Sequence, residues 1–287
     1  MKKKRFYGIL PVGVYLFFMS VGCLPAMAQN PFCFPDSLMQ KYNVQTATLT
    51  TYLLANNQLQ GKGKVQTSYV FSRRGKVIKE SNHLDGSYIK YTYNSLGQLK
   101  KKIYYSAQNK VEIVEEHLRT YEGRLTAIHT PENKKTYTYN AQDQLMKVQE
   151  FYPDPVTKQF VPSSQATFYA YNPEGFKEQI VFQKTDSSQV ISTTIYEYYA
   201  DNTLVKTYEQ FLQEAPVENI YRYNPAGQLV EHQHERGLTR YIYTPEYLLT
   251  KILKAPSAKA APTELTQATY KEYKKDVTLN PKKETDK

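Results

Sequence analysis

The sequence predicts an all-β protein, an elongated and curved antiparallel sheet built of stacked β-hairpin repeats. Three observations support this fold class. The 287 residues include 27 Tyr and 12 Phe, and only 22% are charged, so the chain has aromatic surface to bury and too little charge to favour disorder. One short tyrosine-rich phrase recurs along most of the chain. Each copy surrounds residues that form tight turns, which favours one hairpin per repeat.

The first segment, residues 1–28, is predicted to be a secretory signal peptide. Basic residues follow Met1, an apolar run extends from Phe6 to Leu24, and Ala26-Met27-Ala28 fits a cleavage signal. Two alternatives stay open: a membrane anchor formed by the apolar run, and lipidation of Cys23 in a sequence that loosely fits a lipobox. We expect an exported protein that is periplasmic, secreted or at the cell surface, and that is attached to the membrane only if Cys23 is lipidated.

Export changes the charge and the cysteine content. The formal net charge of +10 includes four positive charges of the predicted signal peptide, which leaves +6 on the mature chain. This lower value weakens the case for an anionic partner, and we expect no nucleic acid. Cys33 would be the one cysteine left, which excludes a disulfide within the mature chain.

Residues 29–64 are predicted to be an N-terminal capping segment, because they hold only one weak copy of the phrase. The repeats themselves occupy residues 65–252, with clear copies at Tyr91–Leu99, Tyr137–Leu145 and Tyr221–Leu229. The turn positions of eight copies are residues 75, 97, 123, 143, 175, 202, 227 and 247, which lie 20 to 32 residues apart. This spacing suits one hairpin per unit.

The turn of each repeat has a specific predicted geometry. Asn, two variable residues and Gly form a type I turn followed by a left-handed residue, which makes a three-residue hairpin loop with a bulge. Glycine supplies the positive φ in Gly97, Gly175 and Gly227. Asp143 and Asn202 are the next most tolerant residue types at this position. Tyr247 occupies the same position and breaks the rule, so we expect a distorted last turn.

This loop also sets the predicted strand register. The ring next to the turn should face an aliphatic side chain, in the pairs Phe71/Val77, Tyr93/Leu99, Tyr139/Leu145, Tyr198/Leu204, Tyr223/Leu229 and Tyr243/Leu249. The ring two residues earlier should face a lysine, whose stem lies on the ring while its ammonium group stays in water. Four such pairs are the candidate ligand-binding residues: Tyr91/Lys101, Tyr137/Lys147, Tyr196/Lys206 and Tyr241/Lys251.

The phrase Tyr-x-Tyr-Asn-x-x-Gly-Gln-Leu resembles the YD repeat of the Rhs/YD-repeat proteins, with Asn in place of the usual Asp and Gln in place of the usual Arg. The resemblance covers roughly residues 65–252. It implies an exported protein, because large members of the family wind their repeats into a hollow β shell around a toxic cargo or act at cell surfaces. This chain departs from that pattern by its shortness and by having no recognisable shell-closing segment or toxin-sized domain after residue 252. The resemblance therefore implies strand architecture and export, and no cargo.

The end of the chain differs from the repeats. Residues 253–265 are rich in Ala, Pro and Lys, which predicts a linker. Within residues 266–287, Thr266–Val277 could add one last strand, and Thr278–Lys287 is expected to be a charged tail.

The sequence offers little for catalysis, so we expect no enzyme and no cofactor. His232 and His234 would share one face of a strand and are a weak metal candidate, but two ligands are too few for a site. A pair of exposed strand histidines is the simpler interpretation. The chain has no glycine-rich phosphate loop and no calcium-binding loop.

These features favour an exported, non-enzymatic β-repeat protein that acts as a structural or interaction surface at the bacterial cell envelope, with envelope polysaccharide or a surface protein as its partner. One alternative is a carbohydrate-binding module that uses exposed tyrosines on the sheet. It requires the rings on the concave face to be exposed, whereas packing in the core is the simpler interpretation of most of them. A second alternative is a truncated relative of the Rhs toxin shells.

Overall fold

The computed structural model describes residues 34–199, 203–212 and 214–273. These residues form one short helix, α1 (Asp36–Lys41), and one antiparallel sheet of eighteen strands. In chain order the strands are β1 (Val44–Ala55), β2 (Gln58–Phe71), β3 (Val77–Asn82), β4 (Tyr88–Tyr93), β5 (Leu99–Tyr105), β6 (Val111–Arg119), β7 (Leu125–His129), β8 (Lys134–Tyr139), β9 (Leu145–Pro153), β10 (Phe160–Tyr171), β11 (Lys177–Lys184), β12 (Val190–Tyr198), β13 (Leu204–Phe211), β14 (Val217–Tyr223), β15 (Leu229–His234), β16 (Gly237–Tyr243), β17 (Leu249–Ala255) and β18 (Glu264–Glu272).

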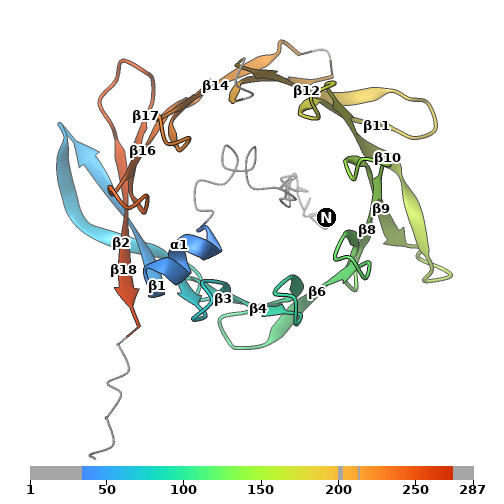
Figure 1. Ribbon diagram of the computed structural model, residues 1–287, viewed down its shortest axis with the longest axis horizontal. Helices are drawn as coiled ribbons and strands as arrows, with labels where there is room; N and C mark the ends of the chain where they lie inside the picture. The colour runs from blue at the N-terminus through green and yellow to red at the C-terminus, as the bar shows by residue number, and fades with distance from the viewer. Residues whose placement is uncertain (1–33, 200–202, 213, 274–287) are drawn as a thin grey trace, which may run out of the picture.

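The sheet closes on itself. Each strand pairs with the next one along the chain, and β1 pairs antiparallel with β18, where Val44 lies opposite Glu272 and Leu53 opposite Glu264. Figure 1 shows the resulting ring from one end. The all-β, antiparallel part of the predicted fold class is right, but the elongated open sheet is wrong. A twisted sheet of this many strands curls, and closure pairs the two edge strands that an open sheet would leave with free backbone groups.

Two more contacts strengthen the closure. The Tyr273 hydroxyl donates a hydrogen bond to the backbone carbonyl of Phe71, and the Asn43 side-chain amide donates one to the Tyr273 carbonyl at 3.1 Å. The first and last segments of the sheet are therefore joined by side chains as well as by strand pairing.

The ring has two different rims. One edge is formed by the predicted repeat turns, from the β2–β3 connection to the β16–β17 connection. We call this edge the repeat rim. The opposite edge, formed by connections such as β1–β2 and β9–β10, is the flared rim, because several of its hairpins splay outward in Figure 1. Residues 253–265, predicted as a linker, form the end of β17, a hairpin loop of this rim and the start of β18.

Helix α1 identifies the inner face of the sheet. It lies inside the ring in Figure 1 and buries Met39 against Ala47 and Phe71 of the sheet. The Phe34 ring meets the Tyr69 ring edge to face, with centroids 5.0 Å apart. Because side chains alternate along a strand, every tyrosine on the same face as Tyr69 points toward the inside of the ring. The capping segment predicted for residues 29–64 thus contains α1, β1 and the start of β2.

The repeat turns have the predicted geometry. Gly97, Gly175 and Gly227 have φ values of 74°, 86° and 75°, and Asp143 has a φ of 65°. Tyr247 also adopts the left-handed conformation, with a φ of 71°. Its turn keeps the hydrogen bonds of the others, from Thr244 N to Leu248 O at 2.8 Å and from Tyr247 N to Thr244 O at 3.0 Å. The expected distortion of the last turn is therefore wrong, and the predicted turn at Asn202 lies outside the described residues.

The predicted register is right beside each turn and wrong two residues further on. Tyr93 pairs with Leu99, and all six predicted aromatic–aliphatic pairs form. A bulge then inserts one extra residue in the second strand of the hairpin, so that Tyr91 pairs with Lys102 and Lys101 pairs with Thr92. A shift of one residue moves a side chain to the opposite face.

No helix among the described residues is long and apolar enough to cross a membrane. The predicted signal peptide, Cys23, Cys33 and the charged tail Thr278–Lys287 lie outside the described residues.

Candidate functional site

The inner face of the ring is closely packed over its second half. One buried cluster runs from β10 to β17 and consists of Tyr169, Ile180, Tyr196, Leu204, Tyr221, Leu229, Tyr241, Leu249 and Ile252. We call this cluster the apolar wall. Its tyrosine rings are covered by their neighbours, since Tyr196 is 7% and Tyr241 6% exposed. These rings belong to the core and leave little area for a ligand to stack on.

Tyrosine hydroxyls join most repeats to the one before them. Five of the tyrosines next to a turn donate a hydrogen bond of 2.6–2.9 Å to a carbonyl at the start of the second strand of the preceding hairpin, in Tyr93 to Val77, Tyr139 to Leu125, Tyr171 to Leu145, Tyr198 to Lys177 and Tyr243 to Leu229. Tyr270 on β18 makes the same bond to Leu249 at 2.6 Å. The tyrosine of the phrase therefore packs through its ring and satisfies its polar end in the next unit.

Glutamine side chains also join neighbouring repeats, through hydrogen bonds between adjacent turns of the repeat rim. Gln98 Nε2 donates to the carbonyl of Gly123 at 3.3 Å, Gln144 Nε2 to Gly175 at 3.4 Å, and Gln228 Nε2 to Tyr247 at 3.2 Å. The side-chain oxygen of each glutamine accepts from the turn asparagine or its equivalent in the same loop, as in Asn94 Nδ2 to Gln98 Oε1 at 3.0 Å. This role was not among the sequence-based predictions, although Gln recurs after the turn position in the sequence.

The first half of the inner face carries charged groups instead. Glu80 on β3 accepts hydrogen bonds from two tyrosine hydroxyls, from Tyr91 at 2.6 Å and from Tyr69 at 3.5 Å. Burial, and next the Glu80 carboxylate, raise the pKa of the Tyr91 hydroxyl well above its ordinary value. Both hydroxyls therefore remain protonated donors to Glu80 at physiological pH.

A second charged group surrounds Glu115 on β6. Its carboxylate lies 3.2 Å from Lys102 Nζ and 2.7 Å from His117 Nε2, and the Tyr104 hydroxyl donates to it at 3.4 Å. Burial alone would raise the pKa of Glu115, but the His117 hydrogen bond and the Lys102 charge outweigh burial and lower it. We call Glu80, Tyr91, Lys102, Glu115 and His117 the polar wall.

The polar wall is largely satisfied by its own members. The exception is His117 Nδ1, which is buried and has no hydrogen-bond partner among the described residues. Lys102 and His117 both belong to the buried part of the sheet. Ion pairs and hydrogen bonds that satisfy one another in this way stabilise a particular arrangement of strands, and they leave few groups to hold a ligand.

The structure separates the tyrosines of the predicted binding pairs from their lysines. Tyr91, Tyr137, Tyr196 and Tyr241 lie on the inner face, where their partners across the strands are Lys102, Val148, Thr207 and Ile252. Lys101, Lys147, Lys206 and Lys251 lie on the outer face, opposite Thr92, Thr138, Glu197 and Ile242. The four predicted Tyr/Lys pairs are therefore wrong, because the bulge turns each lysine outward.

The outward lysines make contacts of their own. Lys101 lies 2.6 Å from Glu116, Lys206 lies 2.7 Å from Glu218, and Lys147 lies over the Phe168 ring at 5.4 Å. Exposed ion pairs of this kind contribute little to stability, because water screens the charges. They place charged groups on the outer face of the ring, beside exposed apolar side chains such as Ile195 and Ile242.

His232 and His234 share the inner face, and their ring centroids are 5.2 Å apart. His232 stacks on Tyr221 at 4.6 Å, and its Nε2 lies 3.2 Å from Asn219 Oδ1. Burial, and next the charge of His234, lower the pKa of His232 to about 4. No group of three or more His, Cys, Asp or Glu among the described residues is placed to hold a metal ion, so the weak metal candidate gains no third ligand.

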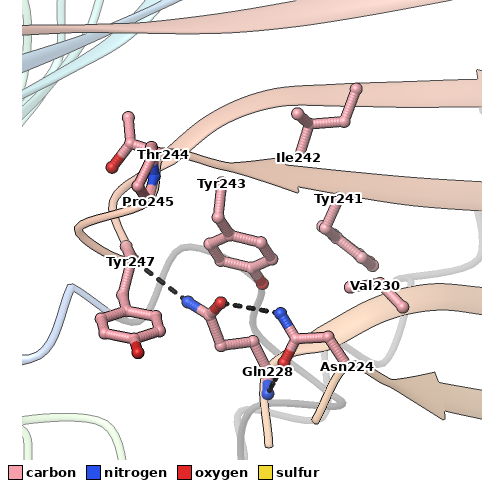
Figure 2. Close-up of a pocket in the computed structure, with 9 residues that line it drawn as sticks. All are labelled: Asn224, Gln228, Val230, Tyr241, Ile242, Tyr243, Thr244, Pro245 and Tyr247. Carbon is pink, nitrogen blue, oxygen red and sulfur yellow. Dashed lines mark hydrogen bonds between the residues drawn. The ribbon is translucent and has the colours of Figure 1, made fainter. Parts of the chain in front are cut away.

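Two surfaces that the sequence did not single out are open to solvent. At the flared rim, apolar side chains at hairpin ends are exposed, with Val156 86% and Leu53 66% exposed, together with Leu59, Leu84, Val111, Val190, Phe211 and Leu212. At the repeat rim, an open depression of about 500 Å³ lies between the β14–β15 and β16–β17 turns. Figure 2 shows Asn224, Gln228 and Tyr247 at this depression.

Comparisons with known proteins find weak structural similarity and no relative in sequence. No family model matches the chain, and no curated protein matches it. A porin-like protein from Bacteroides uniformis aligns at 11% identity and a TM-score of 0.44, over 80% of this chain and 97% of that one. A porin-like protein from Bacteroides vulgatus aligns at 13% identity and a TM-score of 0.31, over 80% of this chain and 100% of that one.

A chain of the Tc holotoxin pore from Photorhabdus luminescens also aligns, at 13% identity and a TM-score of 0.38, over 79% of this chain. This chain spans 15% of the length of that toxin chain. None of these similarities is strong enough to assign a function, and membership in the Rhs/YD-repeat family stays a prediction.

Proposed function

We propose that this protein is an exported, non-enzymatic β-ring that acts as a structural and interaction scaffold at the bacterial cell envelope. The observation that carries the proposal is the closure of the sheet, with most repeats joined to a neighbour by a tyrosine hydroxyl and, at several turns, by a glutamine amide. A ring held in this way is a rigid frame whose rims can present side chains to other molecules.

The flared rim is the surface that we propose for these interactions. Apolar side chains such as Val156, Leu53 and Phe211 are exposed at the ends of separate hairpins. A soluble surface that repeatedly exposes apolar side chains in this way marks a contact region. The outer face between the rims carries ion pairs such as Lys101–Glu116 and Lys206–Glu218, which suits contact with water rather than with lipid tails.

The packing of the inner face bears on the alternative of a carbohydrate-binding sheet. That alternative requires exposed rings on the concave face, and the rings of the apolar wall are covered. The hydroxyls of Tyr91 and Tyr104 also donate hydrogen bonds to the carboxylates of Glu80 and Glu115. The inner face of the sheet is therefore better suited to a structural role than to binding a sugar.

Site-specific photo-crosslinking tests the proposal. A photoreactive residue is placed at Val156 or Phe211 on the flared rim, and at Thr138, an exposed position of the outer face, as the matched control. In cells that export the protein, we expect a defined crosslinked product from the rim positions and none from Thr138. Equal crosslinking at all three positions, or retention of the protein in the cytoplasm, would contradict the proposal.

A further inference from the structure

The geometry points to a binding site for a neutral sugar at the repeat rim, in the depression between the β14–β15 and β16–β17 turns, with Tyr247 as the ring on which a pyranose stacks. The inference goes beyond the proposed scaffold and does not depend on the flared rim. Tyr247 is the one bulky residue at the left-handed position of the described repeat turns.

Tyr247 occupies a backbone position that favours glycine. The equivalent residues in the other described turns are Gly75, Gly97, Gly123, Asp143, Gly175 and Gly227. A bulky residue with a φ of 71° is strained. The Tyr247 side chain is also 49% exposed, so burial of its ring does not offset much of this cost. Strained residues that the fold does not need are found most often where a protein binds or reacts.

The depression beside Tyr247 is large enough for a sugar unit and has the chemistry to hold one. Its volume is about 500 Å³, within the usual range of small-molecule sites. None of its nine labelled lining residues carries a charge, as Figure 2 shows. An uncharged lining disfavours phosphates and carboxylates and favours a neutral ligand, because an ion placed there would lose hydration without gaining a partner.

Two side-chain amides at the depression retain unused donor capacity. Asn224 Nδ2 donates to Gln228 Oε1 at 3.0 Å, and Gln228 Nε2 donates to the Tyr247 carbonyl at 3.2 Å. Each amide nitrogen carries two hydrogens, so each keeps one N–H beyond the bond that holds the turn. Asn224 is fixed by its bond within the turn and Gln228 by its bond to the next repeat turn, and a preorganised donor loses little entropy when a ligand binds.

An aromatic face beside fixed amide donors matches the two sides of a pyranose. The C–H groups on one side of the sugar carry partial positive charge and meet the electron-rich face of the Tyr247 ring. The hydroxyl groups at the sugar edge accept hydrogen bonds from the Asn224 and Gln228 amides. Pro245 also lines the depression and adds a rigid apolar surface beside the ring.

The experiment separates binding from stability through the substitution Tyr247→Gly. Glycine suits the left-handed position, so this variant should unfold at a higher urea concentration than the parent while it loses the stacking ring. Binding of maltohexaose, cellohexaose and chitohexaose to the mature chain is followed by NMR titration. We expect at least one of them to bind the parent, and Tyr247→Gly to bind it about tenfold more weakly.

Tyr121→Ala is the matched control, because Tyr121 is another repeat-rim tyrosine, 95% exposed, and lies outside the depression. We expect this variant to bind the sugar as the parent does. The inference is overturned if none of the three oligosaccharides binds the parent, or if Tyr247→Gly binds as tightly as the parent. A proline-rich peptide that binds the parent through Tyr247 while the sugars do not would also overturn it, in favour of a peptide site.

Discussion

The two halves of the inner face show how much of this ring depends on its turns. From β10 to β17 the inner face is the apolar wall, whose tyrosine, leucine and isoleucine side chains cover one another. From β3 to β6 it is the polar wall, where Glu80 and Glu115 are surrounded by hydroxyl, ammonium and imidazole groups. Both halves nevertheless have the same turn and the same tyrosine contact, from Tyr93 to Val77 in one and from Tyr243 to Leu229 in the other.

This difference indicates that the repeat specifies the hairpin through its turn and its contacts to the neighbouring units, while the inner face can change from apolar to charged. The two walls should therefore respond differently when single side chains are removed. The apolar wall should lose stability in proportion to the area and volume removed. The polar wall should lose most when one member of a charged group is left without its partner.

The largest effect is expected in the apolar wall. Leu229 is 1% exposed and contacts the other members of the cluster. We expect Leu229→Ala to lower the free energy of unfolding by about 2–5 kcal/mol, because it removes buried methyl groups and leaves a cavity. Urea unfolding followed by circular dichroism measures the loss. A change below about 1 kcal/mol would mean that this part of the inner face is less closely packed than the structure indicates.

A somewhat smaller effect is expected at the centre of the polar wall. Glu115→Leu should lower the free energy of unfolding by about 2–3 kcal/mol, because Lys102 and His117 lose the carboxylate that satisfies them. The double variant Lys102→Met/Glu115→Leu should lose less than Glu115→Leu alone, since it removes both charges. Lys102→Met alone completes the comparison. If the double variant lost as much free energy of unfolding as the two single variants together, the two side chains would act independently, which would contradict the polar wall as a coupled group.

A glycine substitution in each half compares the turns directly. A Cβ on Gly227 would meet no atom within 4 Å, so Gly227→Ala should cost about 1 kcal/mol from the left-handed φ alone. A Cβ on Gly123 would lie 1.9 Å from Gln98 Nε2, so Gly123→Ala should also break the glutamine contact and cost about 2 kcal/mol. Equal losses would mean that the glutamine contact contributes nothing to stability.

A pH dependence is expected beside the apolar wall, where His232 stacks on Tyr221. Burial lowers the pKa of His232 from 6.5 to about 4. The unfolded chain therefore binds a proton at this residue before the folded ring does, and the free energy of unfolding should fall as the pH falls from about 6.5 to about 4. The variant His232→Phe keeps an aromatic ring beside Tyr221 and removes this titration. If the parent and the variant lose stability equally over this pH range, His232 is not protonated on unfolding.

The sequence predicted the local geometry of this fold better than its global form. The turn at Gly97 and the pair Tyr93/Leu99 follow from a four-residue pattern that determines φ and the cross-strand neighbour. The pairing of Tyr91 with Lys101 failed because one bulge residue reverses the side to which each later side chain points. The candidate sites inherited this error, so the four lysines lie on the outer face.

Closure could not be predicted in the same way. The pairing of Thr48 with Thr269 joins segments more than two hundred residues apart, and no local pattern specifies such a contact. It follows from the accumulated twist and curvature of all the hairpins between them. The depression at Tyr247 has a similar origin, because its lining comes from two hairpins. A tyrosine at a glycine position was nevertheless visible in the sequence as an exception.

Crosslinking of β1 to β18 tests the closed ring most directly. Thr48→Cys and Thr269→Cys are introduced together in a Cys33→Ser background, because the two threonines pair across the closure on the outer face. The matched control pairs Thr48→Cys with Thr138→Cys on β8, which lies elsewhere around the ring (Figure 1). Under mild oxidation, the closed ring predicts rapid formation of an intramolecular disulfide in the Thr48/Thr269 variant and none in the control. A Thr48/Thr269 variant that stays reduced, or that forms only disulfides between chains, would contradict closure and favour an open sheet.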